Sequence, residues 1–421
     1  MNLKKEEKLE VINTLFINLS CILIFLGSVL LSNQVIYIDT FSYILYFILF
    51  ASIILLIINR INLKKYILII LLAIFGLIST LLSGNIVSCL IGSLYRKEGY
   101  IVILSYLSLF IVASLVKNNK NKELIINVIL MLGIINVVYG LLQFLKIIDI
   151  NTLYPKSFLG NANSFGAICT LYVGLSFGLY IFSKRKLYII YLIMSTIGLI
   201  ISGCMGCYLG FVSIILSIII YIVYLIYKKQ KVKSYIIKII ILFLCVLPIY
   251  LFSSHNRQRI NKDVKSVINQ VVDIMNGNMS NDFGNNRVEI WSKTLSVAPN
   301  YLIHGIGIDR FHYALDNGNF QTSNGLYVDK AHNEYLQILI TEGIFALISY
   351  LIFLGWVIKN VLKNTKYSYV YISLLLAIIG YLVQAFFGIS VTRVTPYLYI
   401  IMGLANNCDK NKKSIVSKTS V

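Results

Sequence analysis

Apolar runs of about 20 residues recur along this chain and leave it few possible folds. The first run extends from Val11 to Ser32 and follows a charged start, MNLKKEEKLE. Such a run crosses ~30 Å of hydrocarbon as a helix, because helical geometry satisfies every backbone polar group. It is too long for a signal peptide and lacks a small-x-small cleavage site, so we expect it to remain as a span. The other expected spans are 41–59, 66–84, 100–116, 124–145, 164–183, 187–203, 207–227, 236–254, 332–358, 368–388 and 394–407.

About twelve spans predict an all-α integral membrane protein. We expect an N-terminal transmembrane bundle of about nine helices at 1–254, a large extracellular loop at 255–331, C-terminal transmembrane helices at 332–407 and a disordered cytoplasmic tail at 408–421. Composition agrees, since 58% of the residues are hydrophobic and only 13% are charged. The net charge of +20 does not indicate nucleic-acid binding, because the lysines recur in short clusters between apolar runs.

The positions of lysine and arginine predict an orientation. With the N-terminus in the cytoplasm, the segments on that side hold most of the 37 lysines and arginines. Short loops rich in these residues stay inside, whereas long loops cross largely regardless of charge. We therefore expect both termini inside and the long loop outside. The basic residues of the short external loops are Arg96, Lys97, Lys146, Lys156 and Arg393.

The long loop contains helical patterns of its own. From Asn261 to Met275 apolar residues recur at spacings of three and four, which predicts an amphipathic helix on the bilayer surface or on the bundle. Asn286 followed by Glu289 resembles an N-cap with its capping-box partner, so we expect a second short helix that carries Arg287 and Trp291. An interfacial anchor is the alternative role for Trp291.

The stretch from Asn281 to Phe345 concentrates the titratable groups and contains three of the four histidines. Ion-coupled transporters place charges at mid-membrane depth, where they are costly. Here the ionisable groups gather at the outer rim, which favours a reaction at the exofacial surface. Glu342, inside an expected span, would pair within the bundle or face a water-filled cavity. Elsewhere Cys204 and Cys207 form a C-x-x-C on an external turn, which is a weak indication of a redox or metal pair.

Several motifs resemble the signature of the O-antigen ligase and O-antigen polymerase superfamily. Those in the long loop and after it are Arg287-Val-Glu-Ile-Trp291, His304-Gly-Ile-Gly-Ile-Asp-Arg-Phe311, Ala331-His-Asn-Glu-Tyr-Leu-Gln337 and Glu342-Gly343. Three earlier segments are similar to an Arg-x-Glu-Gly turn, a family helix and a Gly-Asn-x-Asn loop. These are Leu94-Tyr-Arg96-Lys-Glu98-Gly99, Tyr139-Gly-Leu-Leu-Gln143 and Gly160-Asn-Ala-Asn163.

The resemblance implies a C-type glycosyltransferase architecture and an inverting reaction without metal or other cofactor. Glycan would pass from an undecaprenyl-diphosphate carrier to the hydroxyl of a glycan, lipid or protein acceptor, at the outer face of the bacterial cytoplasmic membrane. No nucleic acid would take part. Polymerase, ligase and protein O-glycosyltransferase share the signature and stay open, and a non-enzymatic exporter or flippase of lipid-linked glycan is the competing class.

The resemblance also assigns roles. Arg287 would hold the diphosphate, because a guanidinium binds phosphate oxygens bidentately and stays charged. His332, with an ordinary pKa of ~6.5, would take the acceptor proton as general base; the alternative is an interfacial histidine that caps a helix. Asn333 and Glu334 lie beside it in sequence, and Trp291 is a further candidate for substrate contact.

Two arginines and one departure complete the expectations. Arg96 and Arg393 would add a phosphate contact or serve as interface anchors. Without a preceding strand, the Gly305-x-Gly307 turn is no nucleotide-binding fingerprint and should bend the loop. Many members carry an arginine at the turn where this chain has Met205. If that alignment holds, Arg96 or Arg393 would have to supply the missing contact.

Overall fold

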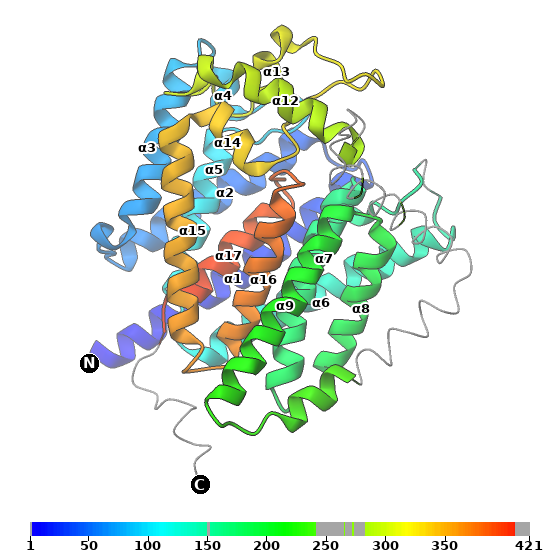
Figure 1. Ribbon diagram of the computed structural model, residues 1–421. Coiled ribbons are helices and arrows are strands. Elements are labelled where there is room, and N and C mark those ends of the chain that lie inside the picture. The colour runs from blue at the N-terminus through cyan, green and yellow to red at the C-terminus, as the bar shows by residue number, and fades with distance from the viewer. Residues whose placement is uncertain (1, 150–151, 241–264, 266–271, 273–282, 409–421) are drawn as a thin grey trace.

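The computed structural model describes residues 2–149, 152–240, 265, 272 and 283–408. Within these residues the chain is helical apart from turns, loops and one isolated bridge between Gln321 and Tyr327. Long helices run side by side and short ones cover one end of them (Figure 1). Apart from residues 265 and 272, the expected amphipathic helix at 261–275 lies outside the described residues, and so does most of the expected span at 236–254.

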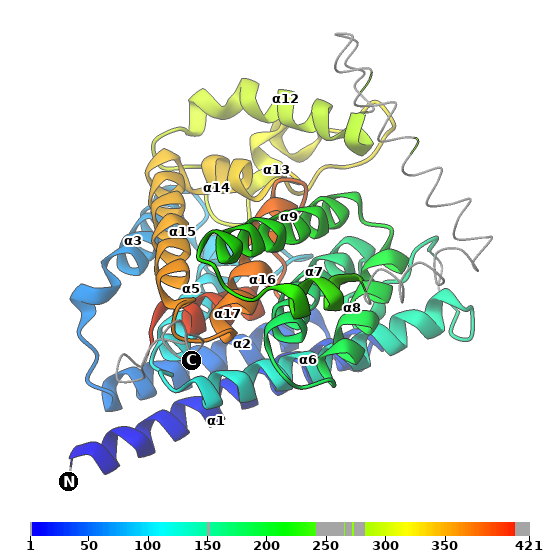
Figure 2. The same cartoon turned by 60° about the horizontal axis from the view of Figure 1, so that its bottom comes forward.

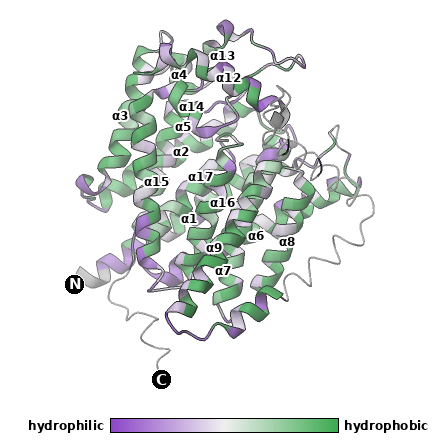
Figure 3. Cartoon of the chain, in the orientation of Figure 1, coloured by the Kyte–Doolittle hydropathy of each residue, from purple (hydrophilic) through white to green (hydrophobic). Residues whose placement is uncertain are grey.

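Seven of the described helices are long and apolar enough to cross a membrane. Three shorter apolar helices lie among them, namely α5 (Tyr100–Ser114), α8 (Tyr188–Ser202) and α16 (Val370–Ala385), and α17 (Thr395–Asn406) is also packed inside. Figure 3 shows these helices as mostly hydrophobic, with polar segments at their ends. The chain is therefore a multi-pass membrane protein. The seven long helices are α1 (Asn2–Ser32), α2 (Ile38–Ile58), α3 (Ile67–Leu82), α6 (Asn119–Phe144), α7 (Ala162–Phe182), α9 (Met205–Tyr227) and α15 (Ile344–Asn364).

Helix α7 lies at the centre of the bundle, between α8, α9 and α16. It meets α16 through glycines one turn apart: a Cβ on Gly174 would lie 2.4 Å from Cα of Ala377, and one on Gly178 would lie 2.5 Å from Cα of Ser373. Small residues four apart let helix backbones approach closely in a membrane, where packing drives association. This G-x-x-x-G spacing explains why α7 is almost wholly buried.

A buried lysine ties three elements together at the end of the bundle opposite the short helices. Lys122 of α6 is completely buried and donates to the Tyr371 hydroxyl (2.9 Å), to the Leu404 carbonyl (2.6 Å) and to the Asn407 carbonyl. The last two acceptors lie at the C-terminal end of α17, where a helix favours positive charge. Glu10 of α1 accepts from the Asn118 amide at 2.6 Å at this same end.

The short helices form a cap over the other end of the bundle (Figures 1 and 2). We call this group the helical cap; its elements are α4 (Ile86–Ile91), α12 (Phe283–Tyr301), α13 (Phe311–Ala314), the 3-10 turn η3 (Asp316–Gly318) and α14 (Glu334–Glu342). Two further 3-10 turns, η1 (Leu63–Tyr66) and η2 (Ser157–Leu159), precede α3 and α7.

The single span expected at 332–358 is wrong, because two helices occupy it. Helix α14 ends at Glu342 and α15 begins at Ile344, with Gly343 at φ 88° between them. The amide of Ile344 donates to the Leu302 carbonyl at 2.7 Å. The segment before the Gly305-x-Gly307 turn is thus packed against the break between α14 and α15. A hydrogen bond between this segment and the start of α15 takes the place of a helical hydrogen bond.

The capping box expected at Asn286 is also wrong. Helix α12 already begins at Phe283, and Asn286 has a left-handed φ of 66° in its first turn. Its side chain donates to Thr322 Oγ1 at 3.2 Å, and Glu289 accepts from the Ser323 amide at 3.0 Å. Both polar side chains therefore fasten the loop that contains Thr322 and Ser323, called the 320s loop below, to α12. They do not cap the helix.

Candidate functional site

His332 lies at the junction of the helical cap and the bundle, immediately before α14. Its backbone is left-handed, with φ 50°. The next residue, Asn333, is the N-cap of α14 and accepts from the amides of Tyr335 (3.0 Å) and Leu336 (3.1 Å). Asn333 is itself buried, so the structure gives it the role of fixing the backbone that carries the histidine.

Three motifs distant in sequence meet at a small pocket beside His332. The pocket has a volume of about 30 Å³. His332 lines it together with Arg96 from the Arg-x-Glu-Gly turn, Asn161 and Asn163 from the Gly-Asn-x-Asn loop, and Gln384 near the end of α16. These residues combine one cation, one imidazole and three amides, which are groups that bind anions and hydroxyls.

Arg287 approaches the pocket from α12. Its Nη2 donates to the carbonyl of Phe387 at 2.9 Å, and Phe387 is one of the pocket-lining residues. Burial lowers the pKa of this guanidinium, while the nearby thiols of Cys204 and Cys207 act in the opposite direction. Arg287 therefore lies between the pocket and the turn before α9.

The surroundings of His332 keep its imidazole neutral. Burial is the largest cause, and the charges of Arg287 and Arg96 add to it, so the pKa falls from 6.5 to about 4 against the opposing effect of Asp329. A neutral imidazole accepts a proton, whereas an imidazolium cannot. At neutral pH the site therefore holds a base next to two cations.

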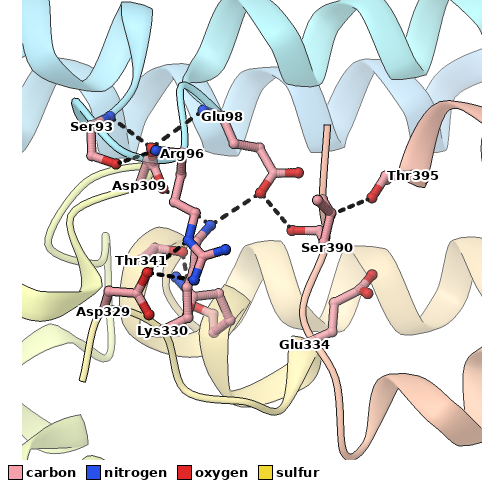
Figure 4. Close-up of polar contacts among 12 residues, drawn as sticks. Ser93, Arg96, Glu98, Asp309, Asp329, Lys330, Glu334, Thr341, Ser390 and Thr395 are labelled. Carbon is pink, nitrogen blue, oxygen red and sulfur yellow. Dashed lines mark hydrogen bonds and ion pairs between the residues drawn. The ribbon is translucent and has the colours of Figure 1, made fainter. Parts of the chain in front are cut away.

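Arg96 and Arg393 have different partners. Arg96 pairs with Asp329, its Nε at 2.7 Å and its Nη2 at 2.6 Å from Oδ2, at the wall of the pocket (Figure 4). Arg393 donates to the Phe158 carbonyl at 2.9 Å, and a Cβ on Gly160 would lie 3.0 Å from its Nη2. Burial and the charge of Arg96 lower the pKa of Arg393 to about 10. Arg393 thus packs against the start of the Gly-Asn-x-Asn loop and holds it in place.

Trp291 holds the segment that precedes the histidine. Its Nε1 donates to the Ala331 carbonyl at 3.0 Å, and its ring lies 6.0 Å from that of Phe387. These contacts place Trp291 within the protein, against the chain on both sides of the pocket. These are the contacts of a positioning residue, and the roles expected from sequence, a substrate contact or an interfacial anchor, stay predictions.

Glu334 faces an inner cavity of about 80 Å³ beneath the pocket. Its Oε1 accepts from the Tyr350 hydroxyl at 2.7 Å and its Oε2 from that of Tyr381 at 3.5 Å. Burial raises the pKa of this carboxyl to about 7. Glu342 lines the same cavity.

Sequence reasoning missed a buried ion network that joins the loops around the site (Figure 4). Lys330 Nζ lies 3.1 Å from Glu98 Oε2 and 3.1 Å from Asp309 Oδ1. Glu98 also accepts from Ser390 at 3.0 Å, and Asp309 accepts from the Ser93 amide at 2.7 Å. Burial alone would raise the pKa of Asp309, but Lys330 lowers it overall. Glu98 and Asp309 belong to the motifs quoted above, so a search for their counter-charge could have found Lys330.

A larger cleft opens on the outer side of the Arg96–Asp329 pair. Its volume is about 780 Å³, and both members of the pair line it. Three tyrosines project into this outer cleft; two of them, Tyr95 and Tyr327, are among the most exposed large side chains in the described part of the chain, at 87% and 72%. Exposed tyrosines beside charged groups form an amphipathic surface. The third tyrosine is Tyr313.

Comparison with known proteins finds a family for the part of the chain that holds Arg287 and His332. Residues 190–351 match the family model described as O-antigen ligase. The match includes Arg287, Trp291 and His332, whereas Arg96 and Arg393 lie outside it. No curated protein sequence matches the chain. The matched region therefore supports the resemblance to the O-antigen ligase and polymerase superfamily that the motifs indicate.

Proposed function

We propose that the protein polymerises or ligates undecaprenyl-diphosphate-linked glycan at the outer face of a bacterial cytoplasmic membrane. The observation that carries this proposal is the convergence of His332, Arg96 and Arg287 at one pocket next to the bundle. The proposal includes a C-type glycosyltransferase architecture of about twelve spans, both termini inside, and domain boundaries near 254, 331 and 407.

In the proposed reaction Arg287 and Arg96 bind the diphosphate, which leaves as the bond between the sugar and phosphate breaks. Guanidinium groups suit a leaving group that gains negative charge, because they bind phosphate oxygens bidentately. The acceptor hydroxyl attacks the anomeric carbon from the opposite side and gives its proton to His332. The electron pair of the broken bond stays on the diphosphate.

The pocket must widen to admit the donor, because about 30 Å³ has room for little more than water. The Arg96–Asp329 pair at its wall is the contact that we expect to open. The donor diphosphate would replace Asp329 as the anionic partner of Arg96. Opening this wall would also join the pocket to the outer cleft.

The outer cleft favours a glycan as the acceptor. Sugars present apolar faces to aromatic rings and hydroxyls to charged groups, and Tyr95, Tyr327 and the Arg96–Asp329 pair offer both kinds of contact. A growing glycan chain bound there would have its end near His332, which lies across Arg96 from the cleft. This favours polymerisation over transfer to protein.

The test compares cells that make wild type, His332→Ala, Arg287→Ala or His304→Ala at matched protein levels. His304 belongs to the same loop region, where its Nδ1 lies 2.7 Å from the Gly305 carbonyl oxygen, and it serves as the matched control. We expect the first two variants to reduce glycan polymer about 100-fold or more and to accumulate single lipid-linked units outside. His304→Ala should keep polymer length and amount.

Unchanged polymer in the His332→Ala cells would rule out the general-base role. A flippase would show a different defect, because its variants would leave the lipid-linked unit on the inner leaflet. Product attached to protein and not to glycan would indicate protein O-glycosylation.

A further inference from the structure

Cys204 and Cys207 are in direct contact at the start of α9. This end of the helix packs on the residue that Arg287 binds, because a Cβ on Gly206 would lie 2.7 Å from Cβ of Phe387, whose carbonyl accepts from Arg287 Nη2 at 2.9 Å. The Cys207 thiol donates to the sulfur of Cys204, and the two Sγ atoms are 2.8 Å apart. Cys204 is the N-cap of α9, and the amide of Cys207 donates to its carbonyl at 3.1 Å. Both side chains are buried, at 3% and 0% exposure. A C-x-x-C on the first turn of a helix is the arrangement used by thiol–disulfide oxidoreductases.

The surrounding helices leave room for this pair. A Cβ on Gly166 of α7 would lie 2.8 Å from Cys204 Cβ and 2.8 Å from Cys207 Sγ. Only glycine at this position lets α7 pack against two adjacent cysteines. Cys169, one turn further along α7, is also buried but is not paired in this way, so it offers a comparison within the same helix.

The two thiols have different environments. The hydrogen bond from Cys207 lowers the pKa of Cys204, against the opposing effect of burial, and the charge of Arg287 lowers it further. The N-terminus of α9 also favours negative charge on the capping residue. Cys204 is therefore the nucleophile of the pair, and Cys207 lies in position to attack it in a second step.

We propose that Cys204 and Cys207 form a redox-active dithiol whose oxidation state sets how strongly Arg287 binds a diphosphate. In the reduced form Cys204 can lose its proton, and the thiolate then competes for the guanidinium. In the oxidised form that sulfur carries no charge and leaves Arg287 to the anion. The effect on glycan transfer rests on the proposed function, whereas disulfide formation does not.

The oxidant is a small organic disulfide, because both thiols are too deeply buried to meet the active site of a protein oxidoreductase. The Cys204 thiolate attacks one sulfur of that disulfide, forms a mixed disulfide and releases the first thiol. Cys207 then loses its proton and attacks the Cys204 sulfur, which releases the second thiol. Two electrons and two protons pass to the oxidant, whose S–S bond breaks as the S–S bond of the protein forms.

The first experiment equilibrates the purified full-length protein with mixtures of reduced and oxidised glutathione. Remaining thiols are blocked with a maleimide, and peptides are mapped by mass spectrometry. We expect a Cys204–Cys207 disulfide in wild type and in Cys169→Ala, and none in Cys204→Ser or Cys207→Ser. Absence of this disulfide in wild type under excess oxidised glutathione would overturn the proposal.

The second experiment measures binding of inorganic pyrophosphate to the same samples by thermal unfolding. We expect several-fold tighter binding in the oxidised protein, and loss of the difference in Arg287→Ala. Equal binding in the two redox states would overturn the link to Arg287. Neither measurement needs glycan transfer, so an inactive wild-type enzyme would count against the proposed function alone.

Discussion

The backbone of His332 is held in a conformation that few residues adopt. Its φ of 50° lies in the left-handed region, and the residues on either side are fixed by Trp291, through the Ala331 carbonyl, and by the Asn333 cap. Strained backbone of this kind persists where surrounding contacts determine it, and it is frequent at active sites. Several contacts thus fix the direction in which the imidazole of His332 points.

The pKa of His332 leads to a prediction about pH. A general base must be unprotonated, so activity falls as the pH drops through its pKa. In the free enzyme that pKa is about 4, because of burial and the charges of Arg287 and Arg96. We expect the acid limb of kcat/KM near pH 4 and that of kcat about one unit higher, because bound diphosphate offsets the two cations. pH–rate profiles of the reconstituted protein measure both.

The matched variant for this measurement is Arg287→Gln, which removes one of the cations that lower the pKa. Its residual kcat/KM should show an acid limb at higher pH than that of wild type, nearer the ordinary histidine value. A wild-type limb of kcat/KM at about 6.5 would contradict the neutral-base argument.

The break between α14 and α15 is the element that brings the Gly-x-Gly turn to the site. A Cβ on Gly343 would lie 2.5 Å from the Ile303 carbonyl oxygen, and one on Gly305 would lie 2.2 Å from that of Thr341. The two glycines therefore let two backbones touch. The amides of Ile306 and Gly307 then donate to carbonyls of α14, at 2.9 and 3.0 Å.

Gly343→Ala should separate these backbones. The substitution meets main-chain atoms at a φ of 88°, so we expect a loss of at least about 2 kcal/mol of stability and a lower unfolding temperature. Gly355→Ala on α15 is the matched control, because a Cβ there meets nothing within 4 Å. It should be neutral or slightly stabilising. Thermal unfolding of the two purified variants provides the comparison, and equal unfolding temperatures would contradict the role of the break.

The apolar runs predicted the long helices of the bundle because length and hydropathy are local properties of the sequence. They did not predict the break at Gly343, since one glycine in an apolar run is compatible with a continuous helix. The prediction of a capping box at Asn286 is wrong for another reason. Thr322 and Asn324, which are distant in sequence, form hydrogen bonds with its side chain. Local capping patterns say nothing about such partners.

The site likewise contains residues that the sequence predicted and residues that it did not. The motifs predicted His332 and Arg96, and both line one pocket. They did not predict the paired cysteines as neighbours of Arg287, nor Lys330 as the partner of Glu98 and Asp309, because each pairing depends on how distant segments pack. For Arg393 the sequence predicted a phosphate contact or an interface anchor, and both stay predictions. Its bond to the Phe158 carbonyl is evident only from the packing.

The whole molecule has two unlike ends, and their difference predicts an orientation. The starts of α1 and α6 meet at one end, since Glu10 bonds the Asn118 amide, and Lys122 joins the end of α17 to them. The helical cap lies at the other end (Figure 1), and His332, which lines the pocket, comes directly before helix α14 of this cap. The positive-inside rule predicts that the first end lies in the cytoplasm, which would place the pocket at the outer face of the membrane.

An epitope inserted next to Gly325, an exposed residue of the 320s loop, should therefore bind antibody on intact protoplasts. The same epitope next to Lys229, an exposed residue just after α9, should bind only after permeabilisation, because that turn lies at the opposite end of the helix from Cys204. Gly325 accepts an insertion well, since a Cβ there meets nothing within 4 Å. The reverse pattern of labelling would place His332 in the cytoplasm. It would then exclude transfer at the outer surface whatever the variants of His332 and Arg287 had shown.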